Sequence, residues 1–129
     1  MTDDRAGTVR SVYDAFAKGD MEALATLLAD TEWYEAEGMP YGGHYRGFQK
    51  IAANVFGPIA GDVENFTARP DEILPLGEDR AIAFGTYRGQ GSAGEVAAPF
   101  AHVWTVRDGK IARFVQYADS HLYRQATGL

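Results

Sequence analysis

The chain has 129 residues, with 12 Lys and Arg against 18 Asp and Glu, a formal net charge of -6 and no cysteine. This length fits one domain over residues 1–129 with a single core. The negative charge argues against nucleic acid or an anionic membrane as a partner, and the missing cysteines exclude disulfides and thiolate chemistry. Because no segment resembles a signal peptide or a membrane span, we expect a cytoplasmic protein.

The first half of the chain predicts three helices. The first helix has apolar residues at the spacing of one helical face, namely Val9, Val12, Tyr13 and Phe16. Gly19 follows at a position typical of a helix end, and Asp20 is a typical N-cap for a second, shorter helix. A third helix is expected over 48–56, where Gly57 and Pro58 should stop it.

The rest of the chain predicts strands. The aromatic segment 31–37 is typical of a strand and precedes a glycine-rich loop. Four further strands are expected, separated by short turn sequences, near 63–76, 80–90, 95–106 and 110–118. Helices followed by an antiparallel meander indicate an α+β domain.

Two motifs fail on their context. Residues 89–94, GQGSAG, match the GxGxxG dinucleotide pattern, but that pattern needs a helix directly afterwards and the sequence predicts a strand. We interpret this segment as a hairpin loop. The histidines His44, His102 and His121 form no short metal-binding pair, so we expect neither a metal nor a cofactor.

The pair Asp108-Gly109 is typical of a two-residue hairpin turn, and such a turn fixes which side chains share a face. Strict pairing around it predicts one bulky face, with Phe100, His102, Trp104, Arg113 and Tyr117. The opposite face then carries smaller residues together with Phe114 and Gln116, and we expect it to line a ligand cavity. The bulky face is predicted to form a homodimer interface. The alternatives are that the bulky face is ordinary core, or that a β-bulge within 110–118 exchanges the faces.

Three segments in this order, YDAFAKGDMEALATLLAD, YGGHYRG and HVWTVRDGKIARFVQYAD, resemble the SnoaL-like branch of the NTF2-like superfamily. The resemblance implies a cone in which three N-terminal helices pack on a curved antiparallel sheet around a pocket. It also implies a homodimer through the outer sheet face. Ketosteroid isomerase and limonene epoxide hydrolase are enzymes of this superfamily. The positions at which ketosteroid isomerase has its catalytic groups hold Val12, Ala36 and Ala101 in this sequence, and the position of the catalytic aspartate of limonene epoxide hydrolase holds Gln116. An amide cannot act as the base.

The resemblance and the aromatic content suggest binding of an apolar cyclic or polyketide-like molecule, with or without cofactor-independent isomerisation, cyclisation, dehydration or hydrolysis. The alternative is a non-catalytic ligand-binding or dimeric interaction module. The candidate ligand-binding residues are Tyr13, Phe16, Tyr34, Tyr41, His44, Tyr45, Phe114 and Gln116.

Three residues are candidate acids or bases for such chemistry: His44, Glu37 and Asp119. Alternation along the strand predicts that Glu35 and Glu37 face away from the cavity. Asp119 precedes a short predicted helix, and we favour it as the N-cap of that helix over a catalytic base.

Overall fold

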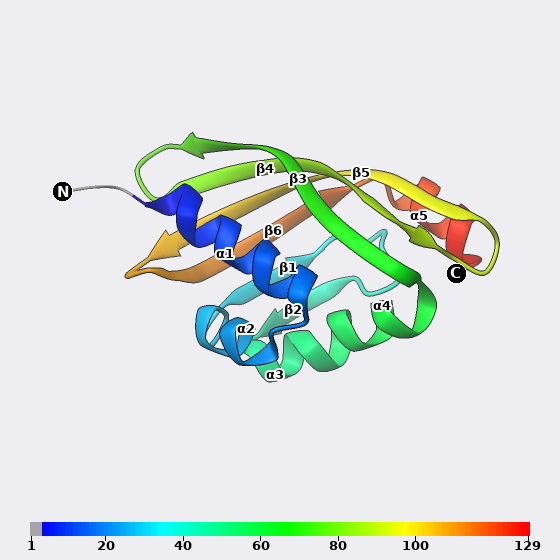
Figure 1. The fold of residues 1–129 in the computed structure, drawn as a ribbon, viewed down its shortest axis with the longest axis horizontal. Helices are drawn as coiled ribbons and strands as arrows, with labels where there is room; N and C mark the ends of the chain where they lie inside the picture. Colours follow the sequence, from blue (N-terminus) through cyan, green and yellow to red (C-terminus); the bar gives the residue numbers. More distant parts are fainter. Residues whose placement is uncertain (1–3) are drawn as a thin grey trace.

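The computed structural model describes residues 4–129, in which helices cover one face of a curved six-stranded sheet (Figure 1). The helical elements are α1 (Arg5–Lys18), α2 (Met21–Leu27), α3 (Phe48–Ile51), the π-helical turn η1 (Ala52–Phe56), α4 (Gly57–Asp62) and α5 (Ser120–Thr127). The strands are β1 (Glu32–Glu35), β2 (Gly43–Arg46), β3 (Glu64–Leu76), β4 (Arg80–Gln90), β5 (Glu95–Arg107) and β6 (Lys110–Ala118). No helix among these residues is long and apolar enough to cross a membrane.

The sheet confirms the predicted α+β class, and its strand order is β2-β1-β6-β5-β4-β3. The strands β3 to β6 form the expected antiparallel meander, whereas β1 pairs with β6 in parallel. The strand β2 lies within the segment predicted to be a glycine-rich loop, and it pairs with β1 as a hairpin. The GxGxxG segment is the β4–β5 connection with no helix after it, as predicted.

The third helical segment does not stop at Gly57 and Pro58, as the sequence predicted, but continues to Asp62. The π-helical turn η1 lies directly before Pro58, and the amide of Gly57 donates to the carbonyl of Ala52, five residues earlier. Pro58 then occupies the first turn of α4, where a missing amide proton costs little. The helix therefore continues past Pro58, and η1 and α4 together lie opposite the sheet.

The β5–β6 hairpin begins in the predicted register but does not keep it. Asp108 and Gly109 have positive φ angles of 53° and 72°, as a type I′ turn requires, and Val106 pairs with Ile111. Thr105 then pairs with Arg113, so that Ala112 is an extra residue in β6 and forms a β-bulge. Beyond the bulge, the inward and outward faces of β6 are exchanged relative to the prediction.

The bulge decides which residues form the core. His102 pairs with Gln116 and Trp104 with Phe114, and all four side chains point toward the helices. The predicted dimer face is therefore wrong for Phe100, His102 and Trp104, which are buried core residues. Tyr117, by contrast, is 60% exposed on the outer face of the sheet.

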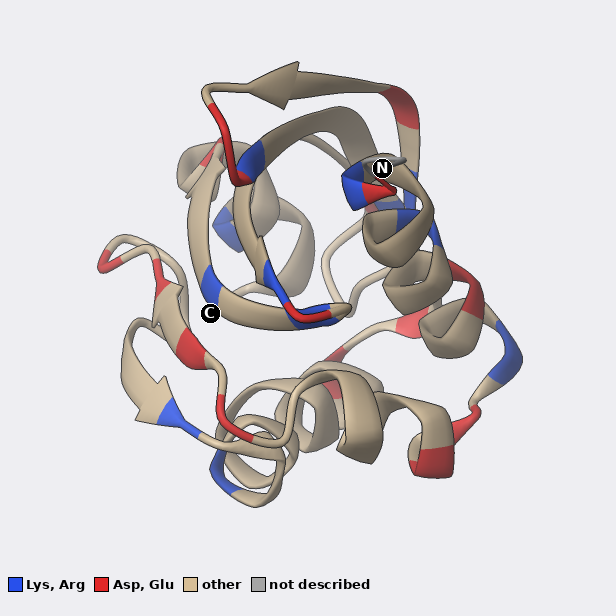
Figure 2. Cartoon of the chain, turned by 90° about the vertical axis from the view of Figure 1, so that its left-hand side faces the viewer, with Lys and Arg blue, Asp and Glu red and all other residues tan. Residues whose placement is uncertain are grey.

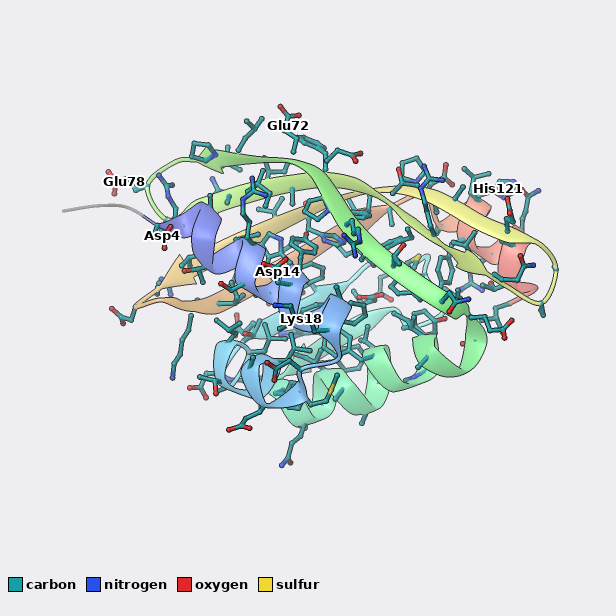
Figure 3. All side chains as sticks on the ribbon, viewed as in Figure 1. Asp4, Asp14, Lys18, Glu72, Glu78 and His121 are labelled. Atoms are coloured by element: carbon teal, nitrogen blue, oxygen red, sulfur yellow. The ribbon has the colours of Figure 1, made fainter. Side chains whose placement is uncertain are left out.

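The charged residues lie at the periphery. Figure 2 shows acidic and basic residues scattered over helices, turns and strand ends. In Figure 3, Glu72, Glu78 and His121 project from the outer edges, while the space between helices and sheet is filled by side chains. A charged group inside this space is therefore an exception among the described residues.

Candidate functional site

A cavity lies between α1, the η1–α4 wall and the inner face of the sheet. The volume in which the centre of a water molecule fits is about 50 Å³, several times what one water needs. Its walls are largely apolar, with a few polar groups, and the lining residues are Val12, Tyr13, Phe16, Trp33, Glu35, Val55, Phe56, Ile59, Phe66, Ala68, Tyr87, His102, Trp104, Phe114 and Gln116. An apolar cavity with a few converging polar groups is typical of a small-molecule site.

Glu35 is the carboxylate in this cavity, and its side chain is 3% exposed. The prediction that it faces away is wrong, because Trp33 stacks on Phe114 with ring centroids 3.7 Å apart and so fixes the inward face of β1. Two residues along the strand, Glu35 points the same way. The indole nitrogen of Trp33 donates to Glu35 Oε1 at 2.9 Å.

Burial raises the pKa of Glu35 to about 7, although hydrogen bonds from Trp33 and Gln116 act in the opposite direction. Desolvation disfavours the charged carboxylate, and it dominates here because the surrounding walls are apolar. The carboxyl group can therefore both take up and release a proton near neutral pH.

A chain of hydrogen bonds crosses the cavity floor, with His102 at its centre. Tyr13 Oη lies 2.6 Å from His102 Nδ1, and Tyr87 Oη lies 2.5 Å from His102 Nε2. Each phenol oxygen also accepts a hydrogen bond from a fixed donor, Trp104 Nε1 at 3.0 Å for Tyr13 and Gln116 Nε2 at 2.8 Å for Tyr87. The five side chains come from α1, β4, β5 and β6, so these hydrogen bonds connect helix α1 to the sheet.

Burial sets the charge state of this chain. It lowers the pKa of His102 well below its usual value and raises the pKa values of Tyr13 and Tyr87. The ring of His102 is therefore neutral near pH 7, with one N–H donor and one acceptor nitrogen. Both phenols keep their hydroxyl protons.

Gln116 links the chain to Glu35. Its Oε1 accepts from the backbone amide of Ala36 at 2.9 Å, and its Nε2 donates to Tyr87. Because Trp33 pairs with Phe114 in the parallel β1–β6 pair, Glu35 is level with Gln116, and both side chains are buried. Gln116 lies in the cavity as predicted, where it neighbours Glu35 and donates to the hydroxyl of Tyr87.

Three phenylalanines stand at the partly exposed edge of the cavity. Phe16 contacts Phe56 and Phe66 edge-to-face, with ring centroids 5.1 and 6.0 Å apart. They come from α1, η1 and β3, and none is fully buried.

Of the predicted ligand-binding residues, the structure brings Tyr13, Phe16, Phe114 and Gln116 together in the cavity. Tyr34 and His44 lie on the outer face of the sheet, where their rings stack with centroids 4.1 Å apart.

Tyr41 and Tyr45 lie apart from the cavity lining. The hydroxyl of Tyr41 contacts that of Tyr123 at 2.8 Å and donates to Asp62 at 3.0 Å. The hydroxyl of Tyr45 donates to the backbone carbonyl of Tyr41 at 2.9 Å.

The three candidate acids and bases all lie outside the cavity lining. Glu37 and His44 are exposed. Asp119 is the N-cap of α5, as favoured from the sequence, and its carboxylate accepts from the amide of Leu122 at 3.0 Å. Sequence reasoning missed Glu35 and Tyr87, which no local motif distinguishes from ordinary strand residues.

The comparisons with known proteins agree with this geometry. A family model described as the SnoaL-like domain matches residues 9–114, whereas no match was found among the curated proteins. An NTF2-like protein from Burkholderia thailandensis is 32% identical, with a TM-score of 0.88 and 98% of each chain covered. TerC, which was co-crystallised with polyporic acid, is 26% identical, with a TM-score of 0.85. The match covers 96% of this chain and 98% of the TerC chain.

A protein of ketosteroid isomerase-like fold from Catenulispora acidiphila, in complex with trimethylamine, shares 20% identity and a TM-score of 0.78, with 95% of this chain and 92% of its own covered. At this identity the likeness concerns the fold alone. The family model, however, spans most of the chain and includes all the residues that line the cavity except Gln116. This chain belongs to the SnoaL-like domain family of the NTF2-like superfamily.

Proposed function

We propose that this protein binds a small, mostly apolar carbonyl compound and that Glu35 acts on it as a general base. The single observation that carries the proposal is a carboxyl group that is 3% exposed in an apolar cavity and whose pKa is raised to about 7. Such a carboxylate removes a proton from carbon more effectively than an exposed one, because its basicity matches neutral pH.

The cavity walls support this class of ligand. Among the lining residues, Glu35 is the one carboxylate, and there is no Lys or Arg that could hold a phosphate. The related protein TerC was crystallised with polyporic acid, an organic molecule. Removal of a proton next to a carbonyl group is the first step of isomerisation, of many cyclisations and of dehydration, and it needs no cofactor.

The proposal is tested by hydrogen exchange in heavy water. The protein is incubated with cyclohexanone or 2-cyclohexenone near pH 8, and loss of the carbon-bound protons next to the carbonyl is followed by proton NMR. We expect exchange well above the buffer rate for the wild type, and close to the buffer rate for Glu35→Gln. The exposed Glu72→Gln variant serves as a matched control and should exchange like the wild type.

Equal exchange by the wild type and Glu35→Gln would refute the role of Glu35. Ligand-induced thermal stabilisation without any exchange by either protein would instead favour the non-catalytic binding function. The two outcomes are distinguishable because binding and exchange are measured separately.

We also propose a homodimer, through the outer face of the sheet. In the observed register Phe84, Ala101 and Tyr117 form a row across three strands, and the neighbouring row contains Ile82, Val103 and Val115. Phe84 is 39% and Tyr117 60% exposed. A contiguous apolar and aromatic surface of this kind is typical of an interface, and a second copy of the chain would cover it.

A further inference from the structure

The hydrogen-bond chain Tyr13–His102–Tyr87 has one more N–H or O–H proton than the two hydrogen bonds within it require. Each phenol brings one hydroxyl proton and the neutral imidazole brings one N–H, three in total. The two contacts to the ring nitrogens, at 2.6 and 2.5 Å, use one proton each. One hydroxyl proton is therefore left to point out of the chain.

The tautomer of His102 decides which hydroxyl has the free proton. If Nε2 is protonated, it donates to Tyr87, Tyr13 donates to Nδ1, and the free proton is on Tyr87. If Nδ1 is protonated, it donates to Tyr13, Tyr87 donates to Nε2, and the free proton is on Tyr13. The donors Trp104 and Gln116 occupy the phenol oxygens in both states and do not favour either one.

Glu35 breaks this symmetry because it lies at the Tyr87 end. Gln116 donates to Tyr87 and is level with Glu35 in the parallel β1–β6 pair. Burial raises the pKa of Tyr87, and the charge of Glu35 raises it further. An ionised carboxylate attracts a hydroxyl proton, so it favours the state in which Tyr87 has the free proton. When the carboxyl group of Glu35 is protonated and neutral, it no longer favours that state.

Few other charges act on the chain. Besides burial and Glu35, the groups that raise the pKa of Tyr87 are Tyr13 and Tyr123, and all three phenols keep their protons near pH 7 because burial raises their pKa values. Arg10, Asp14 and Arg69 border Tyr13 in a separate surface hollow. The side chains that β3 and η1 contribute to the cavity are Phe66, Ala68, Val55 and Phe56, none of which titrates. Glu35 is therefore the group whose charge changes near neutral pH.

We infer that the free hydroxyl proton faces Glu35 from Tyr87 while Glu35 is ionised, and is presented to the ligand by Tyr13 once Glu35 has taken up a proton. The chain holds three protons in both states, and the proton gained by Glu35 is the one that leaves the ligand. Negative charge then appears on the ligand oxygen, and Tyr13 donates to it. This inference rests on the proposed role of Glu35 and specifies the substrate class: a carbonyl compound with its oxygen at Tyr13 and the acidic carbon at Glu35.

The tautomer of His102 is measured directly by nitrogen-15 NMR, without any ligand. Protonated and unprotonated ring nitrogens of neutral histidine resonate in separate regions. The double variant His44→Gln/His121→Gln removes the two exposed histidines, so that His102 gives the only signals. Spectra are recorded from about pH 5.5 to 9, with and without Glu35→Gln in the same background.

We expect the Nε2–H tautomer at high pH and a growing fraction of the Nδ1–H tautomer as the pH falls through about 7, the pKa of Glu35. Glu35→Gln should show a distribution that does not change with pH. The same tautomer at all pH values, an equal change in Glu35→Gln, or protonation of both ring nitrogens in this range would overturn the inference. Each of these results leaves the exchange test of Glu35 unaffected, so the two proposals fail separately.

Discussion

The raised pKa of Glu35 predicts that protein stability falls as the pH rises. The ordinary glutamate pKa is 4.5, and in the folded protein it is about 7. Below pH 4.5 the carboxyl group is protonated in both the folded and the unfolded state. Between the two values only the folded state keeps the proton, so the free energy of unfolding declines with increasing pH. Above pH 7 both states are ionised and the full penalty is present.

The magnitude follows from the same two values. A tenfold change in proton affinity corresponds to about 1.4 kcal/mol, so raising the pKa from 4.5 to about 7 costs about 3 kcal/mol once the group is ionised. About 2.5 kcal/mol of this should appear between about pH 5 and 8.5. The isosteric Glu35→Gln variant lacks the titration, whereas titrations shared by both proteins, including that of His102, cancel in the difference.

The measurement is urea unfolding, followed by the fluorescence of the two buried tryptophans, Trp33 and Trp104. The free energy of unfolding of the wild type minus that of Glu35→Gln should fall steadily across this pH range. Glu72→Gln, at an exposed position of β3, should show a constant difference from the wild type. A constant difference for Glu35→Gln as well would mean that the carboxylate titrates normally, and the case for a buried base would collapse.

Three further predictions concern single positions. Asp119→Ala should lower the free energy of unfolding by about 1 kcal/mol, because it removes the acceptor that caps α5, while Asp119→Asn should change it little; equal losses in urea unfolding would contradict the cap. Gln116→Leu should destabilise the protein by about 1–3 kcal/mol, because the partly buried amide of Ala36 and the buried hydroxyl of Tyr87 lose a hydrogen-bond partner, and unchanged stability would show that these hydrogen bonds contribute nothing. Tyr117→Asp should convert a dimer into a monomer in size-exclusion chromatography with light scattering, and a wild type that is already monomeric at tens of micromolar would refute the outer-face dimer.

Much of the fold could be predicted from the sequence because local patterns determine it. The apolar spacing of α1 and its end at Gly19 are local, as are the turns between β3, β4, β5 and β6. Two errors in the element boundaries arise because a neighbouring segment changes the outcome. Pro58 does not end the helix because η1 absorbs the missing hydrogen bond, and β2 forms because β1 offers it an edge.

The cavity could be predicted only in part, because its polar groups depend on one extra residue. In β6, Ile111, Phe114 and Gln116 are all buried, and this spacing is incompatible with strict alternation from Ile111 onward. Without a bulge, Ile111 would share its face with Arg113, and a guanidinium would lie beneath the helices without a partner. The sequence IARF therefore contained a signal for the bulge, provided that the bulky face was first assigned to the core.

The consequence of the bulge is chemical as well as structural. With strict pairing His102 would lie opposite Val115, and Gln116 would point outward, away from Tyr87 and Glu35. The extra residue Ala112 turns Gln116 inward opposite His102, where its amide donates to Tyr87 and lies next to Glu35. Deletion of Ala112 would therefore separate Glu35 from the hydrogen-bond chain while leaving every polar group of the site in the sequence. Glu35 itself is missed for a separate reason: if Tyr34 is placed in the cavity, alternation along β1 turns Glu35 outward, and exposed groups such as His44 and Glu37 are selected instead.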